Sequence, residues 1–286
     1  MSAAALFDLT GRTIVITGAL GQLGRAYTRA LLQAGARVAL LDLLPAGPEL
    51  SGEALVQRIA PDGVGEGIAV GQLAYLQVNV TDRASLESAL AGIEERWGVV
   101  PDGLINNAAL DSPPGAPAEE NGPFETYPEP SWDKVMAVNT KGPFLCCQVF
   151  GGAMAAAGKG GSIINIGSIY GVVSPNQTIY EYRRGPDKPP FYKPVAYSAS
   201  KSALLNLSRY LATYWAPQGV RVNTLTLAGV FNHQDQAFLE AYLPHVPLGR
   251  MAEPGDYQGP VIFLLSEASR YMTGGNLVID GGWTAW

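Results

Sequence analysis

Short, uninterrupted runs of apolar residues alternate along the chain with longer segments whose apolar positions recur at helical spacing. A run that is apolar throughout predicts a strand buried on both faces, and a segment at helical spacing predicts a helix that covers such strands. The expected strands are Thr13–Thr17, Arg37–Leu41, Leu73–Val78, Gly103–Asn106, Ser162–Ile166, Val220–Leu225 and Leu277–Ile279. The expected helices are Gly21–Ala34, Asp82–Trp97, Trp132–Ala157, Val195–Trp215 and Pro254–Ser266. This order predicts an α/β fold, a doubly wound parallel sheet with helices on both faces.

Two segments interrupt the alternation and are too long to be simple connections. Residues 110–130 are rich in proline, and residues 171–194 carry charges of both signs. Each follows a predicted strand, so we expect both to be loops that border a binding site. Since no linker composition divides the chain, we predict a single domain over residues 1–286 with active-site insertions at these two positions.

Composition and charge exclude several classes of protein. The chain has 286 residues and a formal net charge of −6, which disfavours nucleic acid and anionic membranes as partners. Charged residues make up only 15%, too few for a disordered or coiled-coil protein. No apolar run is long enough to span a bilayer, and Met1 to Thr10 do not resemble a signal peptide.

The cysteines and histidines indicate a reducing compartment and no metal. Cys146 and Cys147 are adjacent, a spacing that disfavours a structural disulfide between them. Reduced thiols are typical of the cytosol, so we predict a cytoplasmic protein. His233 and His245 are the two histidines, and the sequence has no CxxC pair, so we predict no metal site.

A glycine-rich turn joins the first predicted strand to the first helix. It reads Thr17-Gly18-Ala19-Leu20-Gly21-Gln22-Leu23-Gly24. Gly18 permits a tight turn, Gly21 lets the backbone approach a pyrophosphate, and Gly24 lets helix and strand pack closely. The free N–H groups at the start of the helix, around Gly21, Gln22 and Leu23, attract phosphate oxygens. The turn predicts a dinucleotide site; a flexible turn without a ligand is the alternative.

Asp42 ends the second strand, about 20 residues past the turn, the spacing at which a carboxylate binds the adenine ribose. It accepts hydrogen bonds from ribose hydroxyls and repels a 2′-phosphate. Leu43 and Leu44 follow, with no adjacent basic residue to bind such a phosphate. We therefore predict NAD as the cofactor rather than NADP; a loop-capping role for Asp42 is the alternative.

Tyr197 and Lys201 stand four residues apart in the segment Tyr197-Ser198-Ala199-Ser200-Lys201. On a helix they project from one face. An ammonium near a phenol lowers the phenol's pKa, so the pair predicts a general acid/base for an alcohol proton. Such a pair also arises by chance, but its position on the helix after the fifth strand favours chemistry.

Two further polar residues are candidates for the same site. Ser168 directly follows the fifth strand, at the carboxyl edge where open α/β sheets bind ligands. Its hydroxyl is placed to hydrogen-bond a substrate oxygen. Asn139 lies within the long helix before that strand, and a buried amide there needs partners. A satisfied core amide is the structural alternative for Asn139.

Together these residues resemble the short-chain dehydrogenase/reductase family over nearly the whole chain. The likeness also includes Asn106-Asn107-Ala108-Ala109 after the fourth strand and Asp280-Gly281-Gly282 near the C-terminus. The resemblance implies a single-domain Rossmann fold and an oxidoreductase that moves a hydride between nicotinamide and a secondary alcohol or ketone. It also implies a homotetramer or homodimer built on the two long helices.

The resemblance further assigns roles to particular residues. Tyr197 is implied as the general acid/base, Lys201 as the group that binds the nicotinamide ribose and tunes Tyr197, and Ser168 as the group that orients the substrate. Asn139 is implied to hold a water in a proton relay. Besides the glycine turn, Asp42, Tyr197 and Lys201, the implied cofactor contacts are Asn79, Val80, Asn107, Ala108, Gly229 and Val230.

The glycine spacing departs from the family pattern. Gln22 stands where the single-domain branch usually has glycine, so the TGxxGxxG spacing resembles the longer branch that includes sugar-nucleotide epimerases. Ala109 replaces the last glycine of the usual motif. Ala228-Gly229 replaces Pro-Gly, which puts in doubt the contact of Val230 with the nicotinamide carboxamide.

Ser168 and Tyr197 lie 29 residues apart, far more than usual for the family, because a loop is inserted between them. Arg183 and Arg184 in this loop have the fork geometry that binds carboxylate or phosphate. We predict that they, with Tyr170, contact a hydroxylated or anionic substrate such as a sugar, a polyol or an anionic sugar derivative. A solvated loop or a subunit contact is the simpler alternative.

Three classes of function remain in view: an alcohol or sugar dehydrogenase, a sugar-nucleotide epimerase or dehydratase, and a non-catalytic NAD-sensing protein. The glycine spacing favours the second, but the length leaves no room for a separate substrate domain. The third is disfavoured because all four candidate catalytic residues are present. The dehydrogenase is therefore the prediction that the sequence favours.

Overall fold

Seven parallel strands form one sheet in the computed structural model, which describes residues 2–45, 47–61, 69–111, 118–184 and 191–286. The strand order is β3-β2-β1-β4-β5-β6-β7, and each adjacent pair is parallel. The strands are β1 (Thr13–Thr17), β2 (Arg37–Asp42), β3 (Leu73–Gln77), β4 (Gly103–Asn106), β5 (Gly161–Ser168), β6 (Val220–Leu227) and β7 (Asn276–Ile279). This confirms the predicted doubly wound, Rossmann-like sheet.

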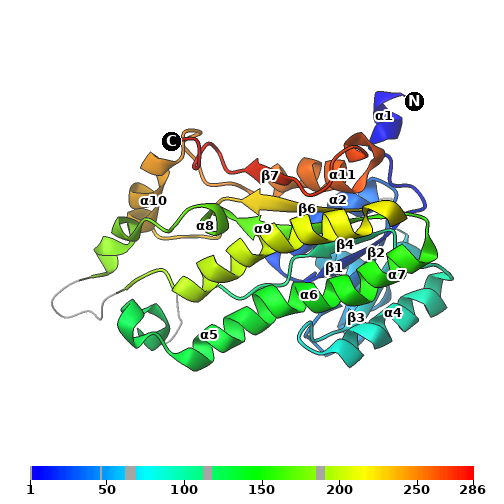
Figure 1. The fold of residues 1–286 in the computed structure, drawn as a ribbon, viewed down its shortest axis with the longest axis horizontal. Helices are drawn as coiled ribbons and strands as arrows, with labels where there is room; N and C mark the ends of the chain where they lie inside the picture. Colours follow the sequence, from blue (N-terminus) through cyan, green and yellow to red (C-terminus); the bar gives the residue numbers. More distant parts are fainter. Residues whose placement is uncertain (1, 46, 62–68, 112–117, 185–190) are drawn as a thin grey trace.

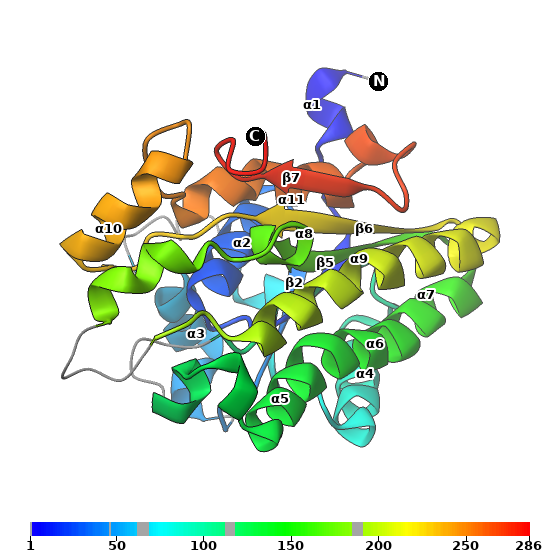
Figure 2. The ribbon, with the colours of Figure 1, turned by 60° about the vertical axis from the view of Figure 1, so that its left-hand side comes forward.

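Helices cover both faces of the sheet (Figures 1 and 2). One face carries α2 (Gln22–Gln33), α3 (Gly52–Ile59) and α11 (Gln258–Leu265). The other carries α4 (Arg83–Trp97), the segment α5 (Glu129–Met136), α6 (Gly142–Cys146) and α7 (Gly152–Ala157), and α9 (Val195–Trp215). Short helices α1 (Ala3–Leu6), α8 (Ile169–Val172) and α10 (Gln236–Tyr242) lie outside these two layers.

The predicted helix Trp132–Ala157 differs in detail from the observed segment. It begins at Glu129, because Pro130 is tolerated in a first helical turn. Two π-helical turns, Ala137–Lys141 and Cys147–Gly151, interrupt its α-helical hydrogen bonding. The first contains Asn139, and single π-helical turns are frequent at functional sites.

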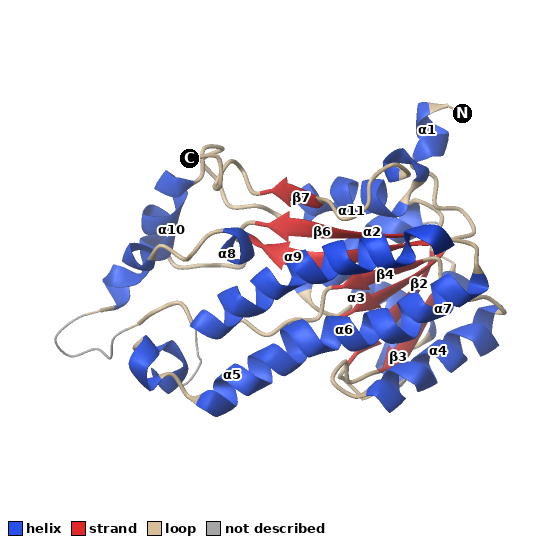
Figure 3. Ribbon diagram, in the orientation of Figure 1, coloured by secondary structure: helices blue, strands red, loops and turns tan. Residues whose placement is uncertain are grey.

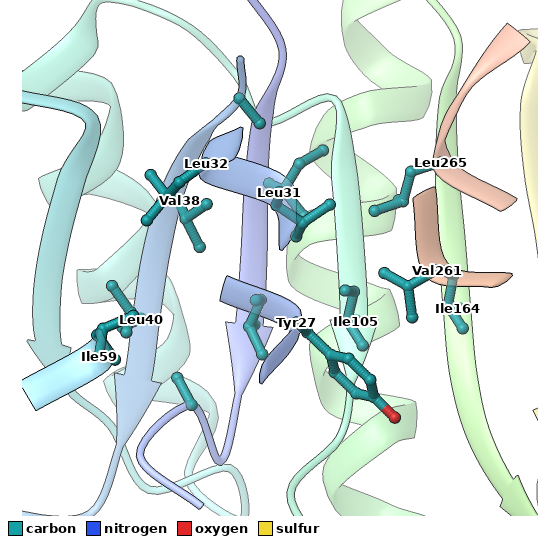
Figure 4. Close-up of a cluster of buried hydrophobic side chains, with 14 of the residues drawn as sticks. Tyr27, Leu31, Leu32, Val38, Leu40, Ile59, Ile105, Ile164, Val261 and Leu265 are labelled. Carbon is teal, nitrogen blue, oxygen red and sulfur yellow. The ribbon is translucent and has the colours of Figure 1, made fainter. Parts of the chain in front are cut away.

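Apolar side chains from the strands fill both interfaces between sheet and helices. On the first face Tyr27 and Leu31 of α2 pack on β1 and β4 residues such as Ile105 (Figure 4). On the second face Phe150 and Trp215 pack on the opposite side of the same strands. Two buried faces explain why the strand sequences are apolar at successive positions.

A buried row of polar side chains crosses the middle of the sheet. Asn106 of β4 donates to Asn165 of β5 at 2.8 Å, and Asn165 donates to Ser208 of α9 at 2.9 Å. Thr224 of β6 donates to the same Ser208 hydroxyl at 2.8 Å. The three strand residues are neighbours in the strand register, so the row joins β4, β5 and β6 to α9.

All strand carboxyl ends point toward the end of the molecule that carries α8 and α10 (Figure 3). A third apolar cluster lies there, outside the sheet, and includes Tyr170 of α8, Tyr180 of the second insertion, Tyr242 of α10 and Trp283 near the C-terminus. The indole of Trp283 stacks on Tyr242, with ring centroids 4.5 Å apart. This cluster positions the loops that surround the carboxyl edge.

No helix within the described ranges is both long and apolar enough to cross a membrane.

Candidate active site

The glycine turn after β1 has the close contacts that its sequence predicts. Gly18 has a φ of +62°, and a Cβ there would lie 2.9 Å from the Cα of Ala108. A Cβ on Gly24 would lie 2.4 Å from the carbonyl oxygen of Gly18, well inside van der Waals contact. Both positions require glycine, since α2 and the start of the β4–α5 loop approach the turn at backbone distance.

Polar groups from β1 and β4 fix this turn. The Asn107 side chain donates to the carbonyl oxygens of Thr17 and Gly18, each at 3.0 Å. The Thr17 hydroxyl accepts from the backbone N–H of Asn107 at 3.0 Å and of Ala108 at 3.1 Å. The predicted residues Asn107 and Ala108 therefore lie against the predicted glycines, at the carboxyl edge between β1 and β4, where the strand order of the sheet reverses.

The turn and the end of β2 fit a dinucleotide. Gly21 is the N-cap of α2 and has no side chain to occupy the free N–H groups at that helix start, which suits a pyrophosphate. Asp42 lies close by, because its carboxylate accepts from the backbone N–H of Leu20 at 2.9 Å. Each carboxylate oxygen retains a lone pair that can accept from a ribose hydroxyl.

The other predicted cofactor contacts also lie along this edge, on both sides of the turn. The Asn79 side chain closes the turn after β3 by accepting from the N–H and hydroxyl of Thr81. Val80 is nearly buried, against Gly142 at the start of α6. The Gly229 N–H donates to the Tyr242 hydroxyl at 2.9 Å, and Val230 bridges to Ala252.

Gln22 has a structural role that the sequence did not predict. Its side-chain amide donates to the carbonyl oxygen of Phe231 at 2.7 Å. The residue that replaces a usual glycine thus connects the glycine turn to the segment after β6. The connection spans the two sides of the carboxyl edge.

Ser168, Tyr197 and Lys201 converge at the carboxyl end of β5. Lys201 is 3% exposed, and its ammonium donates to the carbonyl oxygen of Ile166 at 2.8 Å. The same nitrogen lies 5.8 Å from the centroid of the Tyr197 ring. Ser168 ends β5, is nearly buried and hydrogen-bonds the Tyr197 side chain. The three side chains predicted from sequence are therefore neighbours.

Burial changes the protonation of this group. It lowers the pKa of Lys201 to about 8, an effect that the nearby Asp111 carboxylate opposes. Burial also raises the pKa of Tyr197, Asp111 raises it further, and the hydrogen bond from Ser168 opposes the increase. This differs from the predicted lowering by Lys201, because desolvation of the phenol is the largest effect.

Asn139 is fully buried and ties its helix to the loop after β4. Its amide nitrogen donates to the carbonyl oxygen of Leu110 at 2.8 Å and to the Ser200 hydroxyl at 3.1 Å. Its oxygen accepts from the N–H of Leu110 at 2.7 Å. The amide thus holds the start of the first insertion beside α9.

The predicted substrate residues Arg183 and Arg184 make contacts within the loops. Arg184 donates to the carbonyl oxygens of Phe191 and Gln177, at 3.1 and 3.0 Å, and lies over the Tyr192 ring. Arg183 donates to the Tyr182 hydroxyl and forms an ion pair of 3.7 Å with Asp235, the N-cap of α10. These contacts favour a role in holding the loop, and substrate binding by the arginines stays a prediction.

Tyr170, the third predicted substrate residue, is buried at 8% exposure and meets Trp283 edge-on. Part of the insertion, residues 185–190, lies outside the described residues, as does the segment 112–117 of the first insertion. The described remainder places Tyr170 next to the Tyr197 site, on α8 directly after Ser168.

Sequence reasoning missed one pair of residues at this site. Lys193 and Asp111 form an ion pair, and the Lys193 ammonium lies 4.9 Å from the centroid of the Tyr197 ring. Neither residue was predicted as a site residue, since Lys193 is one of several charged residues in its loop. Their positions, four residues before Tyr197 and just after the Asn-Asn-Ala-Ala motif, were the available signal.

The described residues contain no group of three or more His, Cys, Asp or Glu side chains that could hold a metal ion.

Comparison with known proteins identifies the class that this fold and site define. Residues 12–182 match the model of the short chain dehydrogenase family, and residues 189–284 match a model described as enoyl-(acyl carrier protein) reductase. The chain belongs to the short-chain dehydrogenase family. It is accordingly an oxidoreductase that acts on CH–OH groups with a nicotinamide cofactor, NAD or NADP.

Relatives and solved structures extend the likeness along the whole chain. A D-threitol dehydrogenase of Mycolicibacterium smegmatis is 34% identical, over 97% of this chain and 95% of its own. A ribulose-forming D-arabinitol 2-dehydrogenase of Scheffersomyces stipitis is 33% identical, over 98% and 96%. A Leptospira borgpetersenii short chain dehydrogenase with bound NAD⁺ is 32% identical, with a TM-score of 0.79 over 97% of this chain and 94% of its own.

Proposed function

We propose that this protein oxidises a secondary hydroxyl of a polyol or sugar to the ketone, or runs the reverse reduction, with NAD. The observation that carries the proposal is the convergence of Ser168, Tyr197 and Lys201 at the carboxyl edge, beside the glycine turn. The similarity to D-threitol and D-arabinitol dehydrogenases supports a polyol as the substrate class.

In this proposal each polar residue has a separate task. When bound, the oxidised nicotinamide supplies the two-electron acceptor for the hydride and a nearby positive charge. Tyr197 takes the hydroxyl proton as the substrate carbon loses its hydride, so that the alcohol becomes a ketone. Ser168 donates to the substrate oxygen. Lys201 binds the nicotinamide ribose and, as an ammonium, favours the phenolate that accepts the proton.

Asn139 acts in this scheme through position and proton transfer. Its side chain holds Leu110 and Ser200, which fixes the first insertion beside α9. We retain the proposed proton relay through a water at this residue. The π-helical turn around Asn139 supports it, because single π-helical turns are frequent at functional sites.

The preference for NAD rests on Asp42. Its carboxylate lies at the end of β2 within hydrogen-bond distance of the glycine turn, where the adenine ribose of a dinucleotide binds. A 2′-phosphate there would place like charges together. The ratio of the kcat/KM value for NAD to that for NADP tests this preference. Asp42→Ser should decrease the ratio. A wild-type preference for NADP would overturn the proposal.

The function itself is tested with purified protein, NAD and a panel of tetritols, pentitols, hexitols and aldoses, by following the absorbance of reduced nicotinamide. We expect turnover of at least one polyol and a decrease in kcat of roughly 10²-fold to 10⁴-fold for Tyr197→Phe. Tyr210→Phe is the matched control, since Tyr210 is an exposed tyrosine on the same helix. A Tyr197→Phe variant as active as this control would refute the catalytic assignment.

We further propose that copies of the chain associate through the long helices. Trp132 of α5, Phe144 of α6, and Tyr210 and Tyr214 of α9 are exposed aromatic side chains on these helices. Exposed aromatic groups of this kind favour an interface between subunits. We also retain a cytoplasmic location, which the two free, buried cysteines support.

A further inference from the structure

The Lys193–Asp111 ion pair connects the two active-site insertions. Asp111 begins the first insertion after β4, and Lys193 ends the second insertion just before α9. A second bond joins the same loops, because the N–H of Tyr192 donates to the carbonyl oxygen of Asn121 at 2.8 Å. The pair therefore joins two segments that are far apart in the sequence, next to Tyr197.

The ammonium of Lys193 lies over the aromatic rings of Tyr197 and Tyr170. It is 4.9 Å from the ring centroid of Tyr197 and 6.0 Å from that of Tyr170. The Asp111 charge acts on the same groups, since it raises the pKa values of both tyrosines and opposes the lowering at Lys201. A substrate held at Tyr197 would therefore meet this ion pair.

The Lys193 side chain is held in place before any substrate arrives. Only 10% of it is exposed, against 52% for the Asp111 side chain. The side-chain amide of Gln177 makes two hydrogen bonds to the backbone of Lys193. It accepts from the Lys193 N–H at 2.9 Å and donates to the Lys193 carbonyl oxygen at 3.3 Å. An ammonium fixed in this way loses little conformational entropy when it binds a ligand.

The chemistry of the pair matches a neutral diol. An ammonium has three hydrogens, of which one is used on Asp111, and a carboxylate has several acceptor sites. One hydroxyl of a vicinal diol can accept from Lys193 while the next donates to Asp111. A carboxylate substrate would be attracted by the Lys193 ammonium and repelled by the Asp111 carboxylate. Because the pair carries no net charge, it offers such a substrate no net electrostatic attraction.

We propose that Lys193 and Asp111 form a specificity site that binds hydroxyl groups of a neutral polyol next to the reacting carbon and discriminates against sugar acids. This inference rests on the proposed polyol dehydrogenase function. Arg183 and Arg184 are engaged in contacts within the loops, whereas the Lys193 ammonium of this pair lies over the Tyr197 ring.

The experiment compares Lys193→Met and Asp111→Asn on a pentitol, the corresponding aldonate and a secondary mono-alcohol. Lys193→Met should raise the KM for the pentitol by roughly tenfold to a hundredfold, since it removes a charged hydrogen bond, and leave the KM for the mono-alcohol unchanged. Asp111→Asn should also raise the pentitol KM and increase activity on the aldonate relative to the pentitol. Lys159→Met, an exposed lysine in the turn after α7, is the matched control.

Equal changes on the mono-alcohol and the pentitol, or an unchanged aldonate-to-pentitol ratio in Asp111→Asn, would overturn the specificity site. Lys193→Gln replaces Lys193→Met if the latter does not fold, as judged by circular dichroism. Calorimetric titration of the pentitol into the NAD-loaded protein gives a second readout. If no alcohol is turned over, the dehydrogenase proposal fails, and pentitol binding that is equal in wild type and Lys193→Met independently rejects the site.

Discussion

At the scale of single residues, the site combines a buried lysine and a buried tyrosine. Burial lowers the pKa of Lys201 and raises the pKa of Tyr197, so it favours the neutral form of both side chains. A buried ammonium destabilises the fold unless partners compensate for its desolvation. Lys201 has the carbonyl oxygen of Ile166 as one such partner. We therefore expect Lys201 to reduce the stability of the fold while it supports activity, a trade-off that is common at active sites.

This shift predicts a pH dependence of stability. The folded pKa of Lys201 is about 8, below the unfolded value of 10.5, so between these pH values the unfolded chain binds one more proton. The free energy of unfolding should therefore rise with pH in this window, by about 1 kcal/mol per pH unit from this group. Urea unfolding at several pH values between about 8 and about 10 measures the slope for wild type and Lys201→Met.

The slope of the wild type minus that of Lys201→Met isolates this lysine, because the buried tyrosines are common to both proteins. Lys159→Met, which removes an exposed ammonium, should keep the wild-type slope. Parallel curves for wild type and Lys201→Met would show that Lys201 is not desolvated in the folded protein.

At the scale of elements, the close approach of α2 to the β1 turn makes Gly24 a sensitive position. A Cβ on Gly24 would lie 2.4 Å from the Gly18 carbonyl oxygen, so helix and turn must separate to accept it. Gly24→Ala should lower the free energy of unfolding by about 1–3 kcal/mol and weaken NAD binding. Urea unfolding and the quenching of protein fluorescence by NADH measure the two effects.

The matched control is Gly152→Ala on the opposite face of the sheet. Nothing lies within 4 Å of a Cβ at Gly152, which is in α7, so alanine there should stabilise the protein by about 0.5–1 kcal/mol. Equal unfolding midpoints for the two variants would contradict the close packing at the turn.

The strands and major helices were predictable because their burial is regular. The ranges of β1, β4 and α9 are as predicted, and β5 begins one residue earlier than predicted and ends two residues later, at Ser168. Four short helices of the described residues, α1, α3, α8 and α10, were not predicted. Each has eight residues or fewer and buries few side chains, so its periodic signal is weak.

The candidate site divides in the same way. Tyr197 and Lys201 were predictable because a spacing of four residues on one helix brings two side chains together, whatever the rest of the fold. The Lys193–Asp111 pair was not, because its members are 82 residues apart in sequence and meet only through loop geometry. The pKa of Tyr197 was predicted in the wrong direction, since burial depends on the same loops.

At the scale of the whole molecule, exposed aromatic residues on the long helices predict association. Tyr210 and Tyr214 of α9 are 64% and 62% exposed and stack with ring centroids 6.0 Å apart. Replacing both with glutamate should reduce the molar mass in solution, because charge at an interface core is costly to desolvate. Light scattering after size-exclusion chromatography measures the mass.

Tyr271→Glu serves as the comparison, since Tyr271 is a fully exposed aromatic residue in the turn before β7 rather than on a long helix. Dissociation by this variant, with Tyr210→Glu/Tyr214→Glu unaffected, would place the subunit interface elsewhere.

The polar row through Asn106, Asn165 and Ser208 affects how the active site responds to substitutions in the core. Ser208 lies on the same helix as Lys201, two helical turns away, so the row sets how far α9 can slide along the sheet. A one-residue slip of β5 would leave these buried groups without partners, at about 1–3 kcal/mol each. Substitutions at Asn165, which precedes Ser168 by three residues in β5, are therefore expected to misalign the reacting groups before they unfold the chain.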